Sequence, residues 1–534
     1  MAVQPLRTSF AMMKYRPDIP SQALAPDEYN SGLNVETDIR AINSVLGEQA
    51  ILSQIPGNAI YVSAGFRNNL DYSFIVATVE GRWYNVTGSG ITNVTPGVGS
   101  NPSVALPGYY SDMPITDSWS GDVLFINDSI NPPFYLLPTE TEFRVYGSAP
   151  DNYVWNYNPA WTRLAAGFMR IYATPNVGSI LIAGNLTATT TGSTIVRQPT
   201  TVRWSQAFGI NAGPTTWAPT LTNIANELEI PVAGPIVDGF RSGTNFVICS
   251  YWDSVIFSPI GYTSTVAPVL GIQPLNQGRG LLNENCWANC DQQVFGLDAR
   301  DIWVFDGSTF TGIGNQQVKD WFYAQLNQAY EARTKMINNT QKNQIEIYYC
   351  DADSTGWPNK MLAYRYDLQL WQAPRDVTNA GHPVETPVWT GTTYNRASRT
   401  VAYVQGGTPN SQILQKDVGY ALAGNRPINA EFRRDNITFS PNVPYSSQVM
   451  VHRVLPEVSG QGNLSITVGG ANSVGSTVLF QPTMVNAIDT IDPWQQIDQN
   501  QCRTVTLIAN NSSTTDQFHL TGINWQMTVV SDSR

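Results

Sequence analysis

Few side chains in this chain could carry catalysis or bind a metal, and they are widely spaced. The chain has five cysteines, and the closest two lie in Cys286-Trp-Ala-Asn-Cys290. A zinc site needs a second such pair or a pair of histidines. The three histidines, His382, His452 and His519, lie far from both cysteines in the sequence. The spacing therefore predicts no metal and no other cofactor, and we interpret the cysteines as small buried side chains.

The scarcity of histidine also argues against a Ser-His-Asp site. His452 and His519 lie in alternating, strand-like runs, and His382, before Pro383, is expected in a loop. The motifs Gly-x-Ser-x-Gly, His-Glu-x-x-His and Gly-x-x-x-x-Gly-Lys-Ser/Thr are all absent from the sequence. We therefore expect no nucleophilic, zinc-peptidase or nucleotide-phosphate site of these kinds.

Pairs of carboxylates could hydrolyse glycosides without any such motif. Asp298 with Asp301 and Asp351 with Asp353 are candidate pairs, although any acidic chain contains pairs like these. The run 351–356 also begins like a calcium loop, but Leu362 stands where the loop needs a bidentate glutamate. An ordinary Asp/Ser/Gly turn explains the run better. The sequence therefore predicts no catalytic, cofactor-binding or metal-binding residue.

The composition limits the fold class. In 534 residues there are 30 Lys and Arg against 41 Asp and Glu, a net charge of −11, and charged residues make up only 13%. The hydrophobic share of 42% excludes disorder for most of the chain. Long helices and coiled coils need more charge than this. With 42 Gly and 34 Pro, the composition predicts a mostly β protein with many turns.

The same numbers bear on partners and location. The chain is acidic, and its longest basic run is Arg433-Arg434. We therefore do not expect it to bind nucleic acid through positive charge. Like charge can instead keep DNA from sticking to the wall of a channel. No run approaches 18 apolar residues, so no transmembrane helix is expected. The first 20 residues do not fit a secretory signal, which predicts synthesis in a cytoplasm.

Short alternating runs bounded by Gly, Asn, Asp and Pro predict strands along most of the chain. The clearest runs are 59–63, 73–77, 82–86, 122–127, 133–137, 179–183, 201–205, 246–249, 254–258, 293–296 and 302–305. They recur in pairs every 40 to 60 residues or so, which is typical of a degenerate β-propeller. Stacked β-sandwich domains would give similar runs, but few composition breaks suggest linkers.

We expect an all-β chain in three parts: an extended, Pro-rich arm at 1–30, an irregular β-propeller body at 31–425 and a β-sandwich-like module at 426–534. Alternation is cleaner after residue 425, but it does not exclude that this module completes the propeller. One notable helix is predicted from an N-cap at Asn315 towards Met336. Its helically spaced apolar positions are expected to pack on the sheet below, and they are Val318, Trp321, Phe322, Leu326 and Ala329.

Several segments resemble a known family. They are 278–290 (GRGLLNENCWANC), 294–307 (VFGLDARDIWVFDG), 318–322, 343–349 and 363–371, with weaker matches at 122–127, 131–134, 202–205, Trp217 and 522–534. Together these segments resemble the tail nozzle, also called tail tubular protein B, of short-tailed bacteriophages (podoviruses). The clear part covers about a fifth of the chain, and its motifs carry the fold and no catalytic residue.

The resemblance implies a non-enzymatic structural protein of the virion tail. Six copies would form a homo-oligomeric ring below the adaptor protein that joins it to the portal. Viral DNA would leave through the central lumen during genome ejection, without sequence-specific binding, and tail fibres or spikes would attach outside. No stable membrane insertion is implied. The alternative is a receptor-binding tail protein that binds or cleaves glycans, for which exposed Trp and Tyr beside a carboxylate pair would be the mark.

Overall fold

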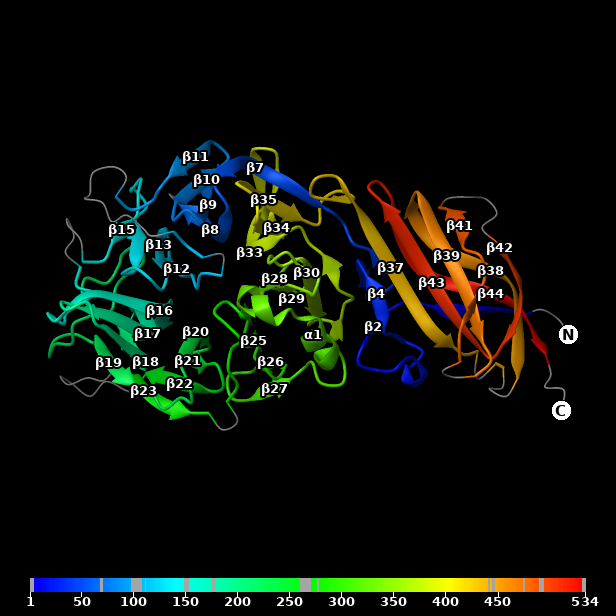
Figure 1. Cartoon of the computed structure of the whole chain (residues 1–534), viewed down its shortest axis with the longest axis horizontal. Helices are drawn as coiled ribbons and strands as arrows, with labels where there is room; N and C mark the ends of the chain where they lie inside the picture. Colours follow the sequence, from blue (N-terminus) through cyan, green and yellow to red (C-terminus); the bar gives the residue numbers. More distant parts are fainter. Residues whose placement is uncertain are drawn as a thin grey trace.

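The computed structural model describes residues 4–530 except 68–70, 98–107, 111, 148–152, 175–177, 260–269, 276–277, 440–441, 444–446, 474–475 and 489–493. Strands dominate this part of the chain, as the turn-rich composition predicts. They form a ring of small sheets, which is joined to a pair of larger sheets (Figure 1). The predicted all-β propeller with a sandwich-like module is confirmed as a fold class.

Seven antiparallel sheets of the described chain form the blades of the propeller. Blade 1 consists of β8 (Ala59–Arg67), β9 (Asp71–Thr78), β10 (Trp83–Thr87) and β11 (Gly90–Asn93). Blade 2 consists of β12 (Thr116–Ser120), β13 (Val123–Asn127), β14 (Phe134–Leu136) and β15 (Arg144–Val145). Blade 3 consists of β16 (Trp161–Thr174), β17 (Gly178–Thr190), β18 (Ile195–Trp204) and β19 (Asn226–Glu229). Blades 4 and 5 are β20 (Ile236–Ser242), β21 (Asn245–Ser250), β22 (Ser254–Pro259) and β23 (Leu270–Pro274); and β24 (Trp287–Cys290), β25 (Gln293–Leu297), β26 (Ile302–Phe305) and β27 (Phe310–Gly312). Blade 6 is β28 (Lys335–Asn339), β29 (Gln344–Tyr349), β30 (Lys360–Arg365) and β31 (Leu370–Trp371), with β32 (Arg375–Asp376) on β30.

Blade 7 closes the ring with a strand from the other end of the propeller segment. Its first three strands are β33 (Ala380–Thr390), β34 (Thr393–Gln405) and β35 (Asn410–Lys416), and its fourth is β7 (Glu48–Pro56), which precedes blade 1 in the chain. Ile413 of β35 pairs with Ile51 of β7, and both are buried. The first and last parts of residues 48–416 are therefore held in one sheet.

The two remaining large sheets form the sandwich. One has the order β42-β38-β44-β6-β5 with β1 also on β44, and the other β36-β37-β43-β39-β40 with β4 on β37 and β41 on β39. Their bounds are β1 (Gln4–Ser9), β4 (Ser31–Leu33), β5 (Val35–Thr37), β6 (Ile42–Ser44), β36 (Ala421–Leu422), β37 (Arg426–Ile437), β38 (Gln448–Gln461), β39 (Asn463–Ala471), β40 (Leu479–Phe480), β41 (Met484–Ala487), β42 (Gln495–Cys502), β43 (Thr504–Ser513) and β44 (Gln517–Val530). Alternating side chains such as Ile466, Leu507 and Ile523 fill the space between the sheets.

Strand pairing divides the chain differently from the predicted boundaries at 31 and 426. The blades occupy 48–416, and the sandwich combines 4–44 with the segment from 421 onward. The propeller is thus inserted into the sandwich. Residues 1–30, expected as an extended arm, include β1, which runs beside β44, and the parallel pair β2 (Lys14–Tyr15) and β3 (Glu28–Tyr29). The sandwich-forming segment does not complete the propeller, because β7 occupies that place.

The predicted helix is shorter than the sequence suggested. The α-helix α1 spans Lys319–Gln325 and is followed by a 3₁₀ segment at Gln328–Arg333, while Met336 already lies in β28. Asn315 is not the N-cap, because Gln316 has a φ of 56°, outside the helical region. Asp18 instead accepts hydrogen bonds from the first-turn amides, at 2.7 Å from Trp321 N. Val318, Phe322 and Leu326 are buried as predicted, and Ala329 is exposed.

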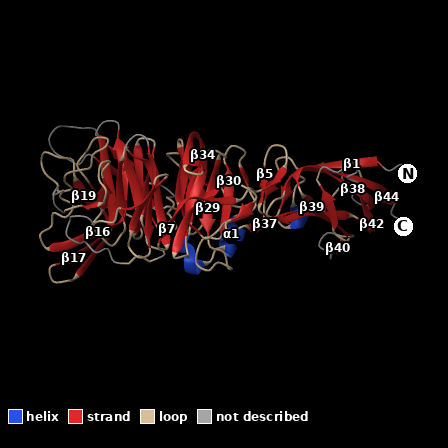
Figure 2. Cartoon of the chain, turned by 90° about the horizontal axis from the view of Figure 1, so that it is seen from above, coloured by secondary structure: helices blue, strands red, loops and turns tan. Residues whose placement is uncertain are grey.

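One hydrophobic core runs through both parts of the molecule. It joins blades 5 and 6 to the sandwich by way of the N-terminal segment, in which Phe10, Tyr15 and Tyr29 are buried. Phe10 and Tyr29 each pack edge-on against Phe432 of β37, at 5.1 and 5.2 Å between ring centroids. Figure 2 shows the propeller and the sandwich in line, with both termini at the far end of the sandwich. None of the helices described could cross a membrane, since each is too short or too polar.

Candidate functional site at the propeller axis

The axis of the propeller is lined by polar side chains, one from the first strand of each blade. First strands contact each other from blade to blade, for example β12 with β16 and β16 with β20, so they form the innermost layer. One polar or aromatic side chain from each first strand belongs to this inner group: Tyr61, Asp117, Arg170, Asp238, Trp287, Lys335 and His382. We call these seven residues, together with Glu284 and Asn285, the axial cluster.

Arg170 and Asp238 form the centre of the axial cluster. The guanidinium of Arg170 donates to both carboxylate oxygens of Asp238, at 2.9 Å from Nε and 2.7 Å from Nη2. Asp238 also accepts hydrogen bonds from Gly239 N, Asn285 N and Trp287 Nε1, at 2.8, 3.1 and 2.9 Å. Both side chains are buried, so this bidentate pair has little competition from water.

The pKa values of the pair follow from this geometry. Burial alone would raise the pKa of Asp238, but the charge and hydrogen bonds of Arg170 lower it below the usual range. Burial alone would lower the pKa of Arg170, and Asp238 reverses that direction and raises it. Both groups are therefore charged near neutral pH. A carboxylate held by five hydrogen bonds and a permanent cation is unsuited to accept or release a proton in catalysis.

The other members of the axial cluster are also engaged. Asp117 accepts hydrogen bonds from the hydroxyls of Tyr61, at 2.9 Å, and of Ser63. Lys335 Nζ donates to Glu284 Oε1 at 2.8 Å. The ring of His382 packs against Tyr61 at a tilt of 32°, with 4.1 Å between centroids. Burial, with Lys335 and Arg170 nearby, lowers the pKa of His382 well below its ordinary value.

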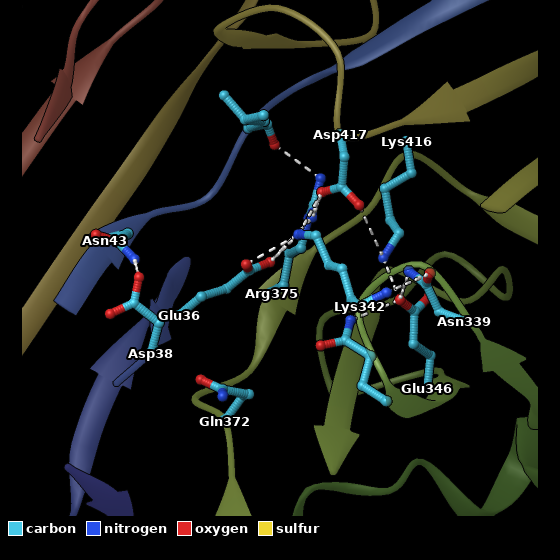
Figure 3. Close-up of polar contacts among 12 residues, drawn as sticks. Glu36, Asp38, Asn43, Asn339, Lys342, Glu346, Gln372, Arg375, Lys416 and Asp417 are labelled. Carbon is cyan, nitrogen blue, oxygen red and sulfur yellow. Dashed lines mark hydrogen bonds and ion pairs between the residues drawn. The ribbon is translucent and has the colours of Figure 1, made fainter. Parts of the chain in front are cut away.

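A second buried charge cluster lies where the sandwich meets blades 6 and 7 (Figure 3). We call it the junction network; its members are Glu36, Lys342, Glu346, Arg375, Lys416 and Asp417. Lys342 Nζ lies 2.7 Å from Glu36 Oε1 of β5 and 3.0 Å from Asp417 Oδ1, and Arg375 Nη1 lies 2.5 Å from Asp417 Oδ1. Gln372 adds hydrogen bonds to both main-chain groups of Thr37. The network ties the N-terminal strands of the sandwich to the propeller.

Charges in the junction network compensate one another. Burial would raise the pKa of Asp417, but Lys342, Lys416 and Arg375 hold it well below the ordinary value. Burial likewise opposes ionisation of Glu346, and Lys416 lowers its pKa. Such networks contribute little net stability when complete, but the loss of one member leaves a buried charge without a partner. The role of the junction network is therefore structural: it holds the sandwich and the propeller in one arrangement.

The predicted carboxylate pairs serve turns. Asp298 and Asp301 do lie together, in the β25–β26 turn, but both are buried: Asp298 Oδ1 accepts Arg300 N and Asp301 N, at 2.6 and 2.8 Å. Arg279 lies 3.5 Å from Asp298 Oδ2. Burial raises the pKa of Asp301. Neither carboxylate offers a free oxygen on an open surface.

Asp351 and Asp353 form the turn that the incomplete calcium pattern suggested. Asp351 Oδ1 accepts hydrogen bonds from Asp353 N and from Asn359 Nδ2, at 2.9 and 2.6 Å. Gly356 completes the turn with a φ of 101°, which a residue with a side chain rarely adopts. The carboxylate of Asp351 thus organises its own loop.

The cysteines and histidines remain apart from each other. Cys286 is buried, with its Sγ 3.0 Å from Thr334 O, and burial raises its pKa to about 12, so it is a poor nucleophile. No group of three His, Cys, Asp or Glu side chains in the described part of the chain could hold a metal ion. His452 and His519 lie in strands as predicted. His382 was expected in a loop, but it lies in β33, which tolerates Pro383 next to a register shift.

Sequence reasoning missed the axial cluster. Its central pair consists of single charged residues on two different strands, Arg170 in β16 and Asp238 in β20, about 68 positions apart. One signal was present: a charged residue inside an alternating strand is costly unless it is paired. Only the closure of the ring shows which residues form the pairs.

Comparisons with known proteins give no family. No family model matches the chain, and no curated protein sequence matches it. Among solved structures, BBS1N in complex with ARL6DN aligns with 72% of this chain and 99% of its own, at 9% identity and a TM-score of 0.39. A Trypanosoma rangeli sialidase aligns with 100% and 97%, at 6% identity and 0.31. A family 43 arabinoxylan arabinofuranohydrolase from Bacillus subtilis aligns with 93% and 95%, at 11% and 0.23. Two of these three are glycoside-cleaving enzymes, but likenesses this weak carry no argument about activity.

Proposed function

We propose that this chain is a structural subunit of the tail nozzle of a short-tailed bacteriophage, assembled in the host cytoplasm and located in the virion tail. The observation that carries the proposal is where the nozzle-like segments fall. Residues 278–290 lead into blade 5 and form β24, and 294–307 form the rest of its centre. Residues 343–349 and 363–371 supply β29, the end of β30 and β31 of blade 6. Helix α1 connects the two blades. The family-like sequence therefore folds into one continuous unit, next to the sandwich.

The described charge clusters agree with a mechanical role. A ring subunit in a DNA conduit must keep its shape under load. The axial cluster holds the blades of the propeller together, and the junction network and the shared hydrophobic core fix the propeller to the sandwich. The axial cluster fills the inside of each propeller, so the proposed path for DNA runs between copies. The acidic balance of the chain, −11, suits such a lumen.

The proposed partners are further copies of this chain in a hexameric ring, the adaptor below the portal, and tail fibres or spikes. In this proposal the chain is not an enzyme, because Asp238 and Asp351 hold their carboxylates in hydrogen bonds to neighbouring groups and Asp298 and Asp301 are buried.

Electron microscopy of the source phage with a gold-labelled antibody tests the assignment. Label at the distal tail, below the portal vertex, is the expected result. Label restricted to radiating fibres or spikes would favour the receptor-binding alternative, and particles without any label would exclude a virion role. Negative-stain images of the purified chain with its adaptor should show closed rings.

A further inference from the structure

Trp252 departs from the pattern that the other tryptophans follow. Seven of them, such as Trp83, Trp204 and Trp303, are almost fully buried, whereas Trp252 is 49% exposed. No other tryptophan in the described chain is exposed to this degree. A single exposed aromatic side chain is common on protein surfaces, so the groups around Trp252 decide whether it marks a binding site. Trp252 lies in the turn between β21 and β22 of blade 4.

The backbone that carries Trp252 is held in place. Trp252 N donates to Ser250 Oγ at 3.1 Å, and Trp252 O accepts from Arg300 Nη2 at 2.9 Å. The carboxylate of Asp253 accepts Ala233 N at 3.0 and 3.1 Å, which fixes the turn to the strand connection before β20. The indole is therefore presented from a preorganised turn, so that a ligand would pay little ordering entropy on binding.

Two further side chains complete a small platform. The ring of Tyr251 stands at 83° to the indole, with 4.7 Å between centroids, so the two aromatics form a corner. Beside them the Arg300 side chain is 50% exposed, and the Trp252 carbonyl is the only hydrogen-bond acceptor found for it among the described residues. Its ion pair with Asp298 is long, at 3.6 Å. The remaining guanidinium N–H groups are free to meet a ligand.

We propose that Trp252, Tyr251 and Arg300 form a non-catalytic saccharide-binding site. A pyranose ring would stack on the indole, with Tyr251 at its edge, and Arg300 would donate to a hydroxyl or carboxylate of the sugar. Trp, Tyr and Arg also occur at protein interfaces, so the choice of a saccharide rests on the small size of the corner and on Asp253 beside it, since Asp is depleted at the cores of protein interfaces. Cleavage is not expected, since Asp298 and Asp301 are buried and the carboxylate of Asp253 is held by Ala233 N and the Ser250 hydroxyl. This site is independent of the nozzle proposal.

The test uses the full chain on a printed array of bacterial surface oligosaccharides, followed by calorimetric titration of the bound sugars. We expect Trp252→Ala to weaken binding roughly tenfold or more. Arg300→Ala should weaken binding of acidic sugars more than that of neutral ones. Tyr420→Ala is the matched control, because Tyr420 is an aromatic residue that is 38% exposed outside the site, and its loss should change nothing. Melting temperatures confirm that each variant is folded.

Three results would overturn this site. The first is no binding of the wild-type chain to any sugar at millimolar concentration. The second is sugar binding that survives Trp252→Ala. The third is a Trp252-dependent complex with a protein and none with a glycan, which would make the corner a protein-docking surface. None of these results bears on the tail location, which the antibody labelling decides separately.

Discussion

Lys416 and Glu346 form an ion pair in which neither side chain has any surface open to solvent. Lys416 ends β35 in blade 7, and Glu346 lies in β29 of blade 6. The carboxylate also accepts hydrogen bonds from Asn339, Gln344 and Tyr348, each at 2.7 Å. The pair thus joins two blades at the point where the closing strand β7 enters, and Lys416 lies 3.5 Å from Asp417 of the junction network.

Replacing one partner of this pair should be costly. Lys416→Met leaves Glu346 charged and buried without a cation, so we expect the free energy of unfolding to fall by about 3–5 kcal/mol. The double variant Lys416→Met with Glu346→Met should recover much of that loss, because no charge remains unpaired. Urea unfolding followed by far-UV circular dichroism measures both variants.

Lys360→Met is the matched control for this experiment. Lys360 also forms an ion pair, with Asp376 at 2.5 Å, but both side chains of that pair are partly exposed. We expect a change of about 1 kcal/mol or less there. Equal losses at Lys416 and Lys360 would contradict the view that burial makes the first pair critical.

The axial cluster predicts a second large effect. Asp238→Asn removes the charge that compensates Arg170 while keeping the shape of the side chain, and we expect a loss of about 3–5 kcal/mol in stability. Asp71→Asn, at an exposed carboxylate of blade 1, should change stability by less than about 0.5 kcal/mol. Thermal unfolding of the two variants measures the difference. A stable Asp238→Asn variant would show that Arg170 finds compensation elsewhere.

Stability should depend on pH through His382. Its folded pKa lies well below 6.5, with Tyr61, Lys335 and Arg170 facing the ring, whereas the unfolded chain takes up a proton near 6.5. The unfolded state therefore binds more protons as the pH falls, and His382 should reduce stability below about pH 6.5, by up to about 1.4 kcal/mol per pH unit. Denaturant midpoints between about pH 7 and pH 5 should show this slope, and His382→Gln should flatten it.

The carboxylates of Asp238 and Asp417 affect stability in a lower range of pH. Asp238 and Asp417 have folded pKa values below the ordinary 3.8, so their contribution to the free energy of unfolding is present above that pH and is lost as the pH falls through the folded values.

A His382→Gln variant that keeps the full slope of stability between about pH 6.5 and pH 5 would show that another group causes the slope.

The sequence predicted local features well and long-range partners poorly. The runs at 59–63, 122–127 and 302–305 are strands β8, β13 and β26. They are mostly apolar and bounded by turn residues, and both faces of these strands are largely buried. Neither β7 in blade 7 nor β1 beside β44 could be predicted, because pairing of the two ends of a segment leaves no local signal. The start of the helix was misplaced for a related reason: the carboxylate that accepts its first-turn amides belongs to Asp18, about 300 positions away.

Removal of residues 1–47 tests the inserted arrangement of the two parts. The propeller keeps all its strands in this truncation, because its closing strand begins at Glu48. The sandwich loses β1, β4, β5 and β6, and Phe432 loses its ring contacts with Phe10 and Tyr29. We therefore expect proteases to cut within 421–530 much faster than in the full chain, while 48–416 survives as a large fragment. Mass spectrometry of the fragments identifies the cuts, with removal of residues 1–3 as the control. Equal loss of both parts would mean that the propeller depends on the sandwich to fold, with Glu36 of the junction network as the first contact to examine.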